Sequence, residues 1–187
     1  MTEIWKTAFE IKLGWIGLVW TRQNIVRLIM PQSDLAPVAT RMKQLAPEAI
    51  EIAPDQTPAF VAETIDRLKR YADGEQVDFS DTPVCAGDVG DMREAIYAAL
   101  RRMPYGKTQT YGELAAEAGY PGMAREIVQA MGQNPIPIIV PCHRIVAANG
   151  KLGGFSAPGG ARTKEKLLAL EQAQPLKADK VQSAFAF

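Results

Sequence analysis

The stretch that organises this chain reads Asn134-Pro135-Ile136-Pro137-Ile138-Ile139-Val140-Pro141-Cys142-His143-Arg144-Ile145-Val146. It joins the only histidine of the protein to one of its two cysteines. Each proline fixes φ at roughly −65° and favours extended geometry in the residue before it. Because the stretch carries so many helix breakers, we predict a stiff, buried, extended approach to Cys142.

Cys142 and His143 are candidate catalytic residues. A thiol presented by a rigid segment beside a titratable imidazole can act as a nucleophile. The alternative is that both side chains are structural, since free cysteine is among the most buried residue types and usually only packs. The dipeptide alone leaves both interpretations open.

Length and composition indicate an ordinary globular protein. The chain has 187 residues, of which 47% are hydrophobic and 22% charged, which suits one large domain or two small ones. No apolar run approaches the roughly 20 residues of a membrane span, and the N-terminus lacks the pattern of a signal peptide. Two cysteines far apart in sequence favour free thiols in a reducing cytoplasm.

The net charge of zero hides an asymmetry between the two halves of the chain. Residues 1–85 hold nine basic and twelve acidic side chains, whereas residues 101–166 hold nine basic and four acidic ones. The second half therefore carries the positive field, and a polyanion is its natural partner.

The first half has the pattern of a small α/β domain, for which we take residues 1–85. Short apolar runs between residues 9 and 30 predict a meander of strands. Helical spacing follows at 35–45 and 58–71, and residues 77–79 could return as a strand. A polar segment with Pro and Gly, residues 81–88, is the expected linker.

The second half, residues 86–174, has a mostly helical pattern, and a tail follows at 175–187. Apolar residues recur every three or four positions from Met92 to Met103, which predicts one buried helical face. A short helix begins after Thr110 as N-cap, and another spans residues 123–132 with Ile127, Val128 and Met131 on its apolar face. Together the two short helices form a helix-turn-helix candidate.

The segment after the Cys-His pair is expected to form a hairpin, a loop and a last helix. Asn149-Gly150 predicts a type I′ turn that folds residues 145–148 back onto 151–153. The glycine-rich loop at 153–160 allows backbone to approach a ligand closely. A final helix is expected over residues 163–172.

With these pieces in place, the second half resembles the O⁶-alkylguanine-DNA alkyltransferase (methylated-DNA–protein-cysteine methyltransferase) family, from about Asp88 to Glu171. The matching motifs are Pro104-Tyr105-Gly106, Thr110-Tyr111-Gly112-Glu113-Leu114-Ala115, Ala124-Arg125, Asn134-Pro135, Pro141-Cys142-His143-Arg144-Ile145-Val146, Phe155-Ser156 and Leu167-Leu168-Ala169-Leu170-Glu171. The first half is similar to the variable N-terminal domain of that family. The resemblance implies an RNase H-like α/β domain followed by a helical, winged-helix-like domain with the helix-turn-helix and the active-site cysteine.

The resemblance also implies an activity. Members of the family repair DNA by moving an alkyl group irreversibly from guanine O⁶, and also from thymine, to their own cysteine, so each molecule works once. Here Cys142 would be the acceptor, His143 would take its proton through a bridging water, and Glu171 would orient His143. Without the resemblance, Glu171 would be read as a solvated carboxylate at a helix end.

Further site residues follow from the same motifs. Tyr111 would donate to the departing guanine, Arg125 would fill the gap left by the extruded nucleotide, and Asn134 would act as the hinge before the active-site segment. The alternatives are a half-buried aromatic side chain, a surface arginine and a helix C-cap. The substrate pocket would be lined by Ile145, Phe155 and Ser156.

The implied partner is double-stranded DNA containing O⁶-alkylguanine, bound through the minor groove by a monomer. No cofactor is implied. No metal is expected either, because Cys85 is the only cysteine outside the motif and a tetrahedral site needs more ligands. The chain departs from the family at Glu126-Ile127-Val128, where Ala-Val-Gly is usual, and at residues 157–160, where the pocket loop is about two residues longer.

Two rival functions remain. A Cys-His hydrolase or acyltransferase would use the same dyad on a carbonyl and would turn over with thioester or peptide substrates. A helix-turn-helix protein without chemistry would bind DNA as a regulator or lesion flagger, and replacing Cys142 would leave its biology unchanged.

Overall fold

The computed structural model describes residues 3–173, so the predicted tail at 175–187 lies outside the described residues. The chain divides into two compact units. Unit 1 runs to Asp88 and includes Pro135–Ile139, and unit 2 comprises Val89–Asn134 and the chain from Val140 onward. The predicted domains differ from these units in the placement of residues 86–88 and 135–139, all of which belong to unit 1.

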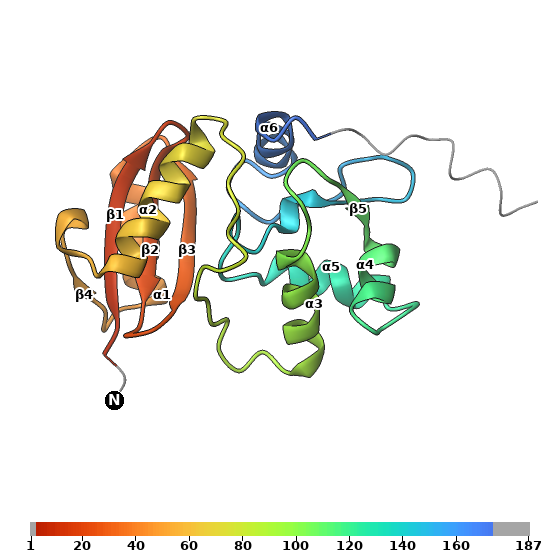
Figure 1. The fold of residues 1–187 in the computed structure, drawn as a ribbon, viewed down its shortest axis with the longest axis horizontal. Coiled ribbons are helices and arrows are strands. Elements are labelled where there is room, and N and C mark those ends of the chain that lie inside the picture. Colours follow the sequence, from red (N-terminus) through yellow and green to blue (C-terminus); the bar gives the residue numbers. More distant parts are fainter. Residues whose placement is uncertain (1–2, 174–187) are drawn as a thin grey trace, which may run out of the picture. The chain divides into compact units, whose positions relative to one another are not determined.

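Unit 1 contains a mixed four-stranded sheet of order β3-β2-β1-β4 (Figure 1). β1 (Trp5–Ile11), β2 (Gly14–Trp20) and β3 (Ile25–Gln32) form the predicted antiparallel meander. β4 (Ile50–Glu51) pairs in parallel with β1 and was not predicted, because two exposed residues give no alternation pattern to detect.

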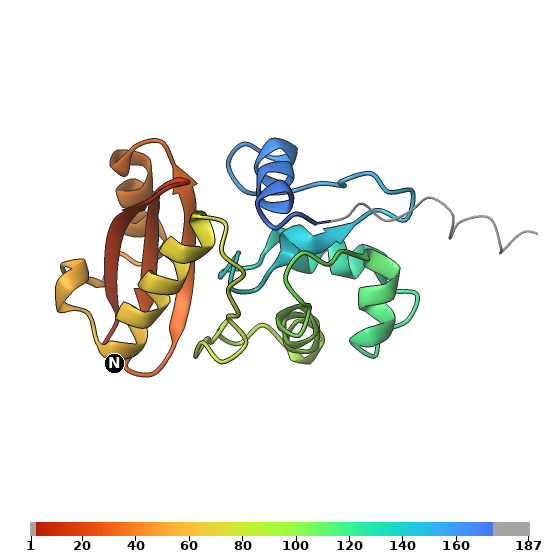
Figure 2. The same cartoon turned by 45° about the horizontal axis from the view of Figure 1, so that its top comes forward.

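Two helices cover opposite faces of this sheet, α1 (Leu35–Leu45) and α2 (Ala59–Ala72), as Figures 1 and 2 show. A short 3₁₀ helix, η1 (Pro54–Gln56), precedes α2. Successive side chains of a strand point to opposite faces, and β2 is buried on both: Gly17 faces Met42 of α1, while Leu18 is fully buried. Both helices were predicted.

The segment after α2 does not form the strand predicted at Val77–Phe79. Val77 and Phe79 are buried, and the ring of Phe79 packs edge-on against Tyr71 at 6.0 Å between centroids. The outer edge of β3 is instead occupied by the chain around Val84, which bridges to Ile25, and by the Pro135 carbonyl, which accepts from the amide of Leu28 (2.9 Å). The segment expected to be a linker therefore begins on the sheet.

Unit 2 contains four α-helices among the described residues: α3 (Asp91–Arg101), α4 (Tyr111–Glu117), α5 (Ala124–Gly132) and α6 (Ala161–Leu170). Two short parallel strands, β5 (Gln109–Thr110) and β6 (Ile145–Val146), lie between them. No helix in residues 3–173 is both long and apolar enough to cross a membrane.

The two helices of the predicted helix-turn-helix are α4 and α5. Thr110 caps α4 as predicted, and Glu113 completes a reciprocal capping box with it. α5 is fixed to α3 by the hydroxyl of Tyr97, which donates to the carbonyl of Ala130 (3.0 Å). The predicted apolar face of α5 is wrong at Val128, whose residue surface is 50% exposed, because Ala130 rather than Val128 completes the buried face with Ile127.

The turn at Asn149-Gly150 is not the predicted type I′ hairpin. The amide of Gly150 donates to the carbonyl of Ala147 (3.0 Å), and the amide of Ala147 donates to the carbonyl of Lys151 (2.9 Å). Gly150 alone has a positive φ, 75°, so the loop has three residues and ends in a left-handed glycine. Residues 145–146 pair with β5 instead of folding back onto 151–153.

Candidate active site

Cys142 begins a single turn of 3₁₀ helix, η2 (Cys142–Arg144), and is 5% exposed. The prediction of an extended approach is therefore wrong, both at the cysteine and before it, where residues 138–139 form a turn. Pro141 has φ −81° and ψ 64°, and the amide of Cys142 donates to the carbonyl of Val140 at 2.8 Å, which is an inverse γ-turn. Ile138, before it, has a left-handed φ of 71°, so the chain bends twice to bring the sulfur to its position.

Asn134 connects the end of the helix-turn-helix to the cysteine. Its side-chain nitrogen donates to the carbonyl oxygen of Val140 at 2.8 Å and to the sulfur of Cys142 at 3.2 Å. One amide group therefore holds both the backbone of the turn and the thiol. These two contacts join the residue after Gln133 to the segment that carries the cysteine.

The residue after the cysteine belongs to a buried imidazole–carboxylate pair. His143 Nε2 lies 2.6 Å from Oε1 of Glu171, and both side chains are fully buried. The pair joins η2 to the C-cap of α6 across 28 positions of sequence. Glu171 is therefore not the solvated carboxylate that its sequence position alone would indicate.

Burial and neighbouring charge set the protonation of this pair. Burial lowers the pKa of His143, against the opposing effect of Glu171, so the imidazole is held neutral. Burial alone would raise the pKa of Glu171, but the hydrogen bond with His143 and the hydrogen bonds and charge of Arg144 lower it to about 2. A neutral imidazole beside a carboxylate donates through Nε2, which leaves Nδ1 as the basic nitrogen.

Two buried cations belong to the site, and the sequence analysis gave neither a role. Arg144 donates to both carboxylate oxygens of Glu171, at 2.9 Å and 3.2 Å. Lys164, 1% exposed, donates from Nζ to the carbonyl oxygen of Ile145 and lies 5.9 Å from the centroid of the Tyr111 ring. Burial lowers the pKa of Lys164 to about 8, while the charge of Cys142 raises it.

A signal for the buried lysine was present in the last helix. Lys164, Leu167, Leu168 and Glu171 stand at the i, i+3, i+4 and i+7 positions of α6, which is the spacing of one buried face. Charged residues at both ends of an apolar stripe are unusual, because buried charges need partners. That pattern marks both as candidates for a site.

The thiol lies in an environment with opposing effects. Burial raises the pKa of Cys142, whereas the hydrogen bond from Asn134 and the charge of Lys164 lower it. A buried thiol without such neighbours would stay protonated and inert. The pKa of Cys142 stays raised overall, so the donor and the cation offset only part of the effect of burial, and the thiol needs a base to remove its proton.

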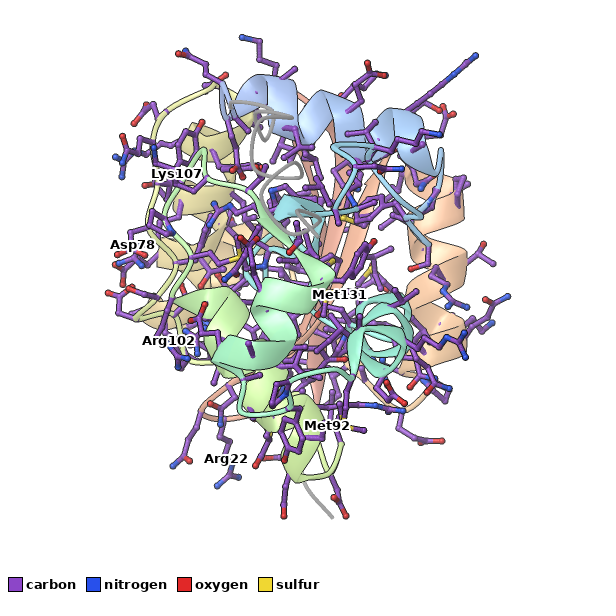
Figure 3. The ribbon with its side chains drawn as sticks, turned by 90° about the vertical axis from the view of Figure 1, so that its right-hand side faces the viewer. Arg22, Asp78, Met92, Arg102, Lys107 and Met131 are labelled. Atoms are coloured by element: carbon purple, nitrogen blue, oxygen red, sulfur yellow. The ribbon has the colours of Figure 1, made fainter. Side chains whose placement is uncertain are left out.

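Cys142 opens onto a cavity of about 300 Å³. The lining residues are Tyr111, Val128, Met131, Gly132, Cys142, Gly154, Phe155 and Ser156. Figure 3 looks at the side of unit 2 that carries α4 and α5, and Met131 in the last turn of α5 is labelled there. The cavity volume is at the small end of ligand pockets.

Tyr111 forms one side of this cavity from the first turn of α4. Burial and then the charge of Cys142 raise its pKa, so its hydroxyl keeps its proton and can donate. A Cβ added at Gly153 would lie 2.8 Å from that hydroxyl. Glycine at this position is therefore needed for the loop to pass so close to Tyr111.

The predicted site residues divide into three groups. Tyr111, Phe155 and Ser156 line the cavity with Cys142, and Ser156 Oγ donates to the carbonyl of Gly132 at 3.3 Å. His143, Glu171, Asn134 and Ile145 are not among the lining residues; Ile145 is fully buried. Arg125 is exposed near the start of α5, as is Glu126.

The described part of the chain contains no cluster of side chains arranged as a metal site. Among residues 3–173, no group of three or more His, Cys, Asp and Glu side chains is arranged to hold a metal ion. Cys85 and Cys142 are both free thiols, the former exposed and the latter buried.

Comparison with known proteins agrees with the motifs. Residues 91–173 match the model of the 6-O-methylguanine DNA methyltransferase DNA-binding domain. The methylated-DNA–protein-cysteine methyltransferase of Haemophilus influenzae is 33% identical over 172 residues, which cover 92% of this chain and 88% of the relative. The enzyme of the same name from Mycobacterium tuberculosis is 41% identical over 117 residues, 63% of this chain and 68% of the relative.

Solved structures agree with the fold. The crystal structure of the Mycobacterium tuberculosis O6-methylguanine methyltransferase matches with a TM-score of 0.71 and 31% identity over 95% of this chain and 98% of that one. The Mycobacterium tuberculosis OGT in complex with DNA matches with a TM-score of 0.71 and 30% identity, over 92% and 96% of the two chains. The α/β fold and the aligned sequences together establish that this chain belongs to the methylated-DNA–protein-cysteine methyltransferase family.

Proposed function

We propose that this protein repairs DNA by moving the alkyl group of O⁶-alkylguanine, and of O⁴-alkylthymine, onto the sulfur of Cys142 in one irreversible turnover. The single observation that carries the proposal is the position of Cys142. Its thiol lines a cavity large enough for a small ligand. The next residue in the chain, His143, is paired with Glu171, and both of these side chains are buried. The named relatives are methylated-DNA–protein-cysteine methyltransferases.

The chemistry is an in-line displacement at the alkyl carbon. His143 takes the thiol proton through a bridging water, and Glu171 accepts a hydrogen bond from Nε2 as the imidazole becomes charged. The thiolate forms the new S–C bond, and the C–O⁶ bond breaks with its electron pair leaving on the guanine. Tyr111 donates its hydroxyl to the departing ring, and the proton lost by the thiol ends on the guanine.

Lys164 supports the thiolate in this mechanism. It is a buried cation whose charge lowers the thiol pKa, and it lies over the ring of the proposed donor Tyr111. A fixed positive charge in a water-poor site stabilises developing negative charge more strongly than it would in water. Asn134 acts on the same sulfur through its hydrogen bond.

DNA binding is assigned to α4 and α5. α5 docks in the minor groove, and Arg125 fills the space left by the extruded nucleotide, because a stacked base cannot present its O⁶ to a buried sulfur. The protein acts as a monomer in the cytoplasm, which suits its free thiols. Unit 1 corresponds to an RNase H-like domain and unit 2 to a winged-helix-like one.

The test is transfer of a radiolabelled methyl group from O⁶-methylguanine in a duplex oligonucleotide. With DNA in excess, label should accumulate on the protein to one methyl per molecule and then stop, and Cys142→Ala should accept none. Cys85→Ala is the matched control and should behave as the unchanged protein. Turnover of an excess of thioester substrate would instead support the hydrolase, and DNA binding without labelling would support the non-catalytic binder.

A further inference from the structure

Arg144 carries a buried positive charge that the proposed transfer step does not use. The residue is 6% exposed, and its guanidinium makes three hydrogen bonds. Two are the donations to Glu171 described above, from Nε and Nη2. The third runs from Nη1 to the backbone carbonyl of Met103 at 2.7 Å. The two donations to Glu171, one to each oxygen, fix the plane of its carboxylate as well as its charge.

The turn at Tyr105-Gly106, which follows α3, also contacts Glu171 and its neighbour Leu170. The amide of Gly106 donates to Oε2 of Glu171 at 3.2 Å, and the hydroxyl of Tyr105 donates to the carbonyl of Leu170 at 3.2 Å. The guanidinium of Arg144 lies 5.9 Å from the centroid of the Tyr105 ring. These two hydrogen bonds join the turn to the end of α6, across 65 positions of sequence.

Gly106 is specifically required for this arrangement. Its φ is 68°, in the left-handed region that other residues rarely adopt. A Cβ at this position would lie 2.7 Å from the backbone oxygen of Glu171. The turn can therefore approach the end of α6 only with glycine here.

We propose that Arg144 and the Tyr105-Gly106 turn form a positioning clamp, which keeps Glu171 charged and aimed at His143 and thereby fixes which imidazole nitrogen of His143 carries the proton. The clamp acts on His143 through Glu171 and touches no reacting atom. The inference deepens the proposed function and, for its role in alkyl transfer, rests on it.

The physical reason lies in the hydrogen-bonding options of the pair. A charged carboxylate can only accept, so it requires a proton on Nε2 of His143 and places the lone pair of the imidazole on Nδ1, where it can act as the base. If Glu171 became protonated, its hydroxyl would donate to Nε2 and favour the tautomer with hydrogen on Nδ1. Arg144 prevents this, because removing one partner of a buried pair leaves the other charge uncompensated.

The protein offers a direct readout, because His143 is its only histidine. Nitrogen-15 NMR of the untagged protein therefore shows a single imidazole. We expect the Nε2–H tautomer in the unchanged protein at pH 6 to 7, and a shift toward the Nδ1–H tautomer in Arg144→Met. An unchanged tautomer in a folded Arg144→Met protein would overturn the clamp.

The second readout is the single-turnover rate on methylated duplex DNA between pH 6 and pH 9. In Arg144→Met the rate should fall at least tenfold at pH 6, and the loss should shrink as rising pH deprotonates Glu171 again. A merely structural role would reduce the rate equally at every pH, which would overturn the proposal. Arg144→Lys, which keeps the charge without the fork, should lose less and with the same pH trend.

Controls separate this inference from the proposed function. Arg22→Met removes an exposed arginine of a surface ion pair with Glu3 and should change neither readout. If Arg144→Met does not fold, Arg144→Lys decides: a pH profile identical to that of the unchanged protein contradicts the clamp. If the unchanged protein transfers no methyl group, the proposed function fails, while the NMR measurement still tests the clamp on its own.

Discussion

The side-chain nitrogen of Asn134 lies 3.2 Å from the sulfur of Cys142 and 2.8 Å from the carbonyl oxygen of Val140. The first contact lowers the pKa of a thiol that burial raises. Asn134→Leu removes the donor at similar volume, so the thiol pKa should rise further. At neutral pH we expect about a tenfold lower transfer rate, one pKa unit of thiolate, and the same loss at every pH below the raised pKa of the thiol.

This effect is measured as the single-turnover rate against pH. Gln133→Leu, an exposed neighbour in the sequence, is the control and should keep the original profile. A thiolate titration, followed by ultraviolet absorbance, that gives Asn134→Leu the same midpoint as the unchanged protein would mean that the asparagine acts only through the backbone of the turn.

Acid stability should depend on the buried carboxylate. The pKa of Glu171 is lowered from 4.5 to about 2, so its charged form stabilises the folded state above pH 4.5, and this stabilisation is lost as pH falls toward 2. The shift corresponds to about 3 kcal/mol. His143, whose pKa is lowered from 6.5 by burial, adds to the loss as pH falls below that value.

Denaturant unfolding at a series of pH values from 7 to 3 measures this dependence. In Glu171→Gln the unfolding free energy should be lower at neutral pH and should fall less steeply on acidification, since the titrating group is gone. Equal slopes for the two proteins would show that the carboxylate does not titrate in the folded state as described.

Extrusion of the damaged nucleotide should depend on Arg125. Unstacking a base costs a few kcal/mol, and a side chain that fills the gap offsets that cost only in a duplex. Arg125→Ala should therefore slow repair of duplex DNA by at least about tenfold while leaving the reaction with free alkylguanine nearly unchanged. Arg102→Ala, also exposed, is the control; equal losses on both substrates would argue against the extrusion role.

Val128 should limit the size of the lesion that the cavity accepts. It lines the cavity and is half exposed, and a β-branched side chain on a helix cannot easily rotate away. Val128→Ala removes bulk without weakening α5, since alanine favours helix. The rate with benzylguanine should rise relative to methylguanine. Gln129→Ala, exposed on the same helix and outside the cavity lining, should leave that ratio unaltered.

Local patterns predicted most of the fold, and non-local contacts account for the differences. Apolar periodicity located α1, α2 and α3, and Thr110 marked the start of α4. β4 was missed because its pairing with β1 is not encoded in two exposed residues. The 3₁₀ turn at Cys142 was missed because proline restricts φ but does not fix ψ, and here Pro141 takes ψ 64°.

The same limit applies to the site. The motifs identified Cys142, His143 and Glu171, and the structure brings the last two within 2.6 Å. The roles of Arg144 and Lys164 were not predicted. The helical spacing of Lys164 with Leu167 and Leu168 was a signal for a buried lysine, whereas no local pattern distinguishes Arg144 from an exposed arginine. Their burial depends on α6 packing against η2, which only the three-dimensional structure shows.

The most direct test of the account is tandem mass spectrometry of the protein after incubation with duplex DNA containing O⁶-methylguanine. We predict one methyl group per molecule, on the peptide that contains Cys142 and on its sulfur, with the peptide of Cys85 unmodified as an internal control. A methyl group on Cys85 instead, or a Cys142 peptide that stays unmodified while the lesion disappears from the DNA, would contradict it.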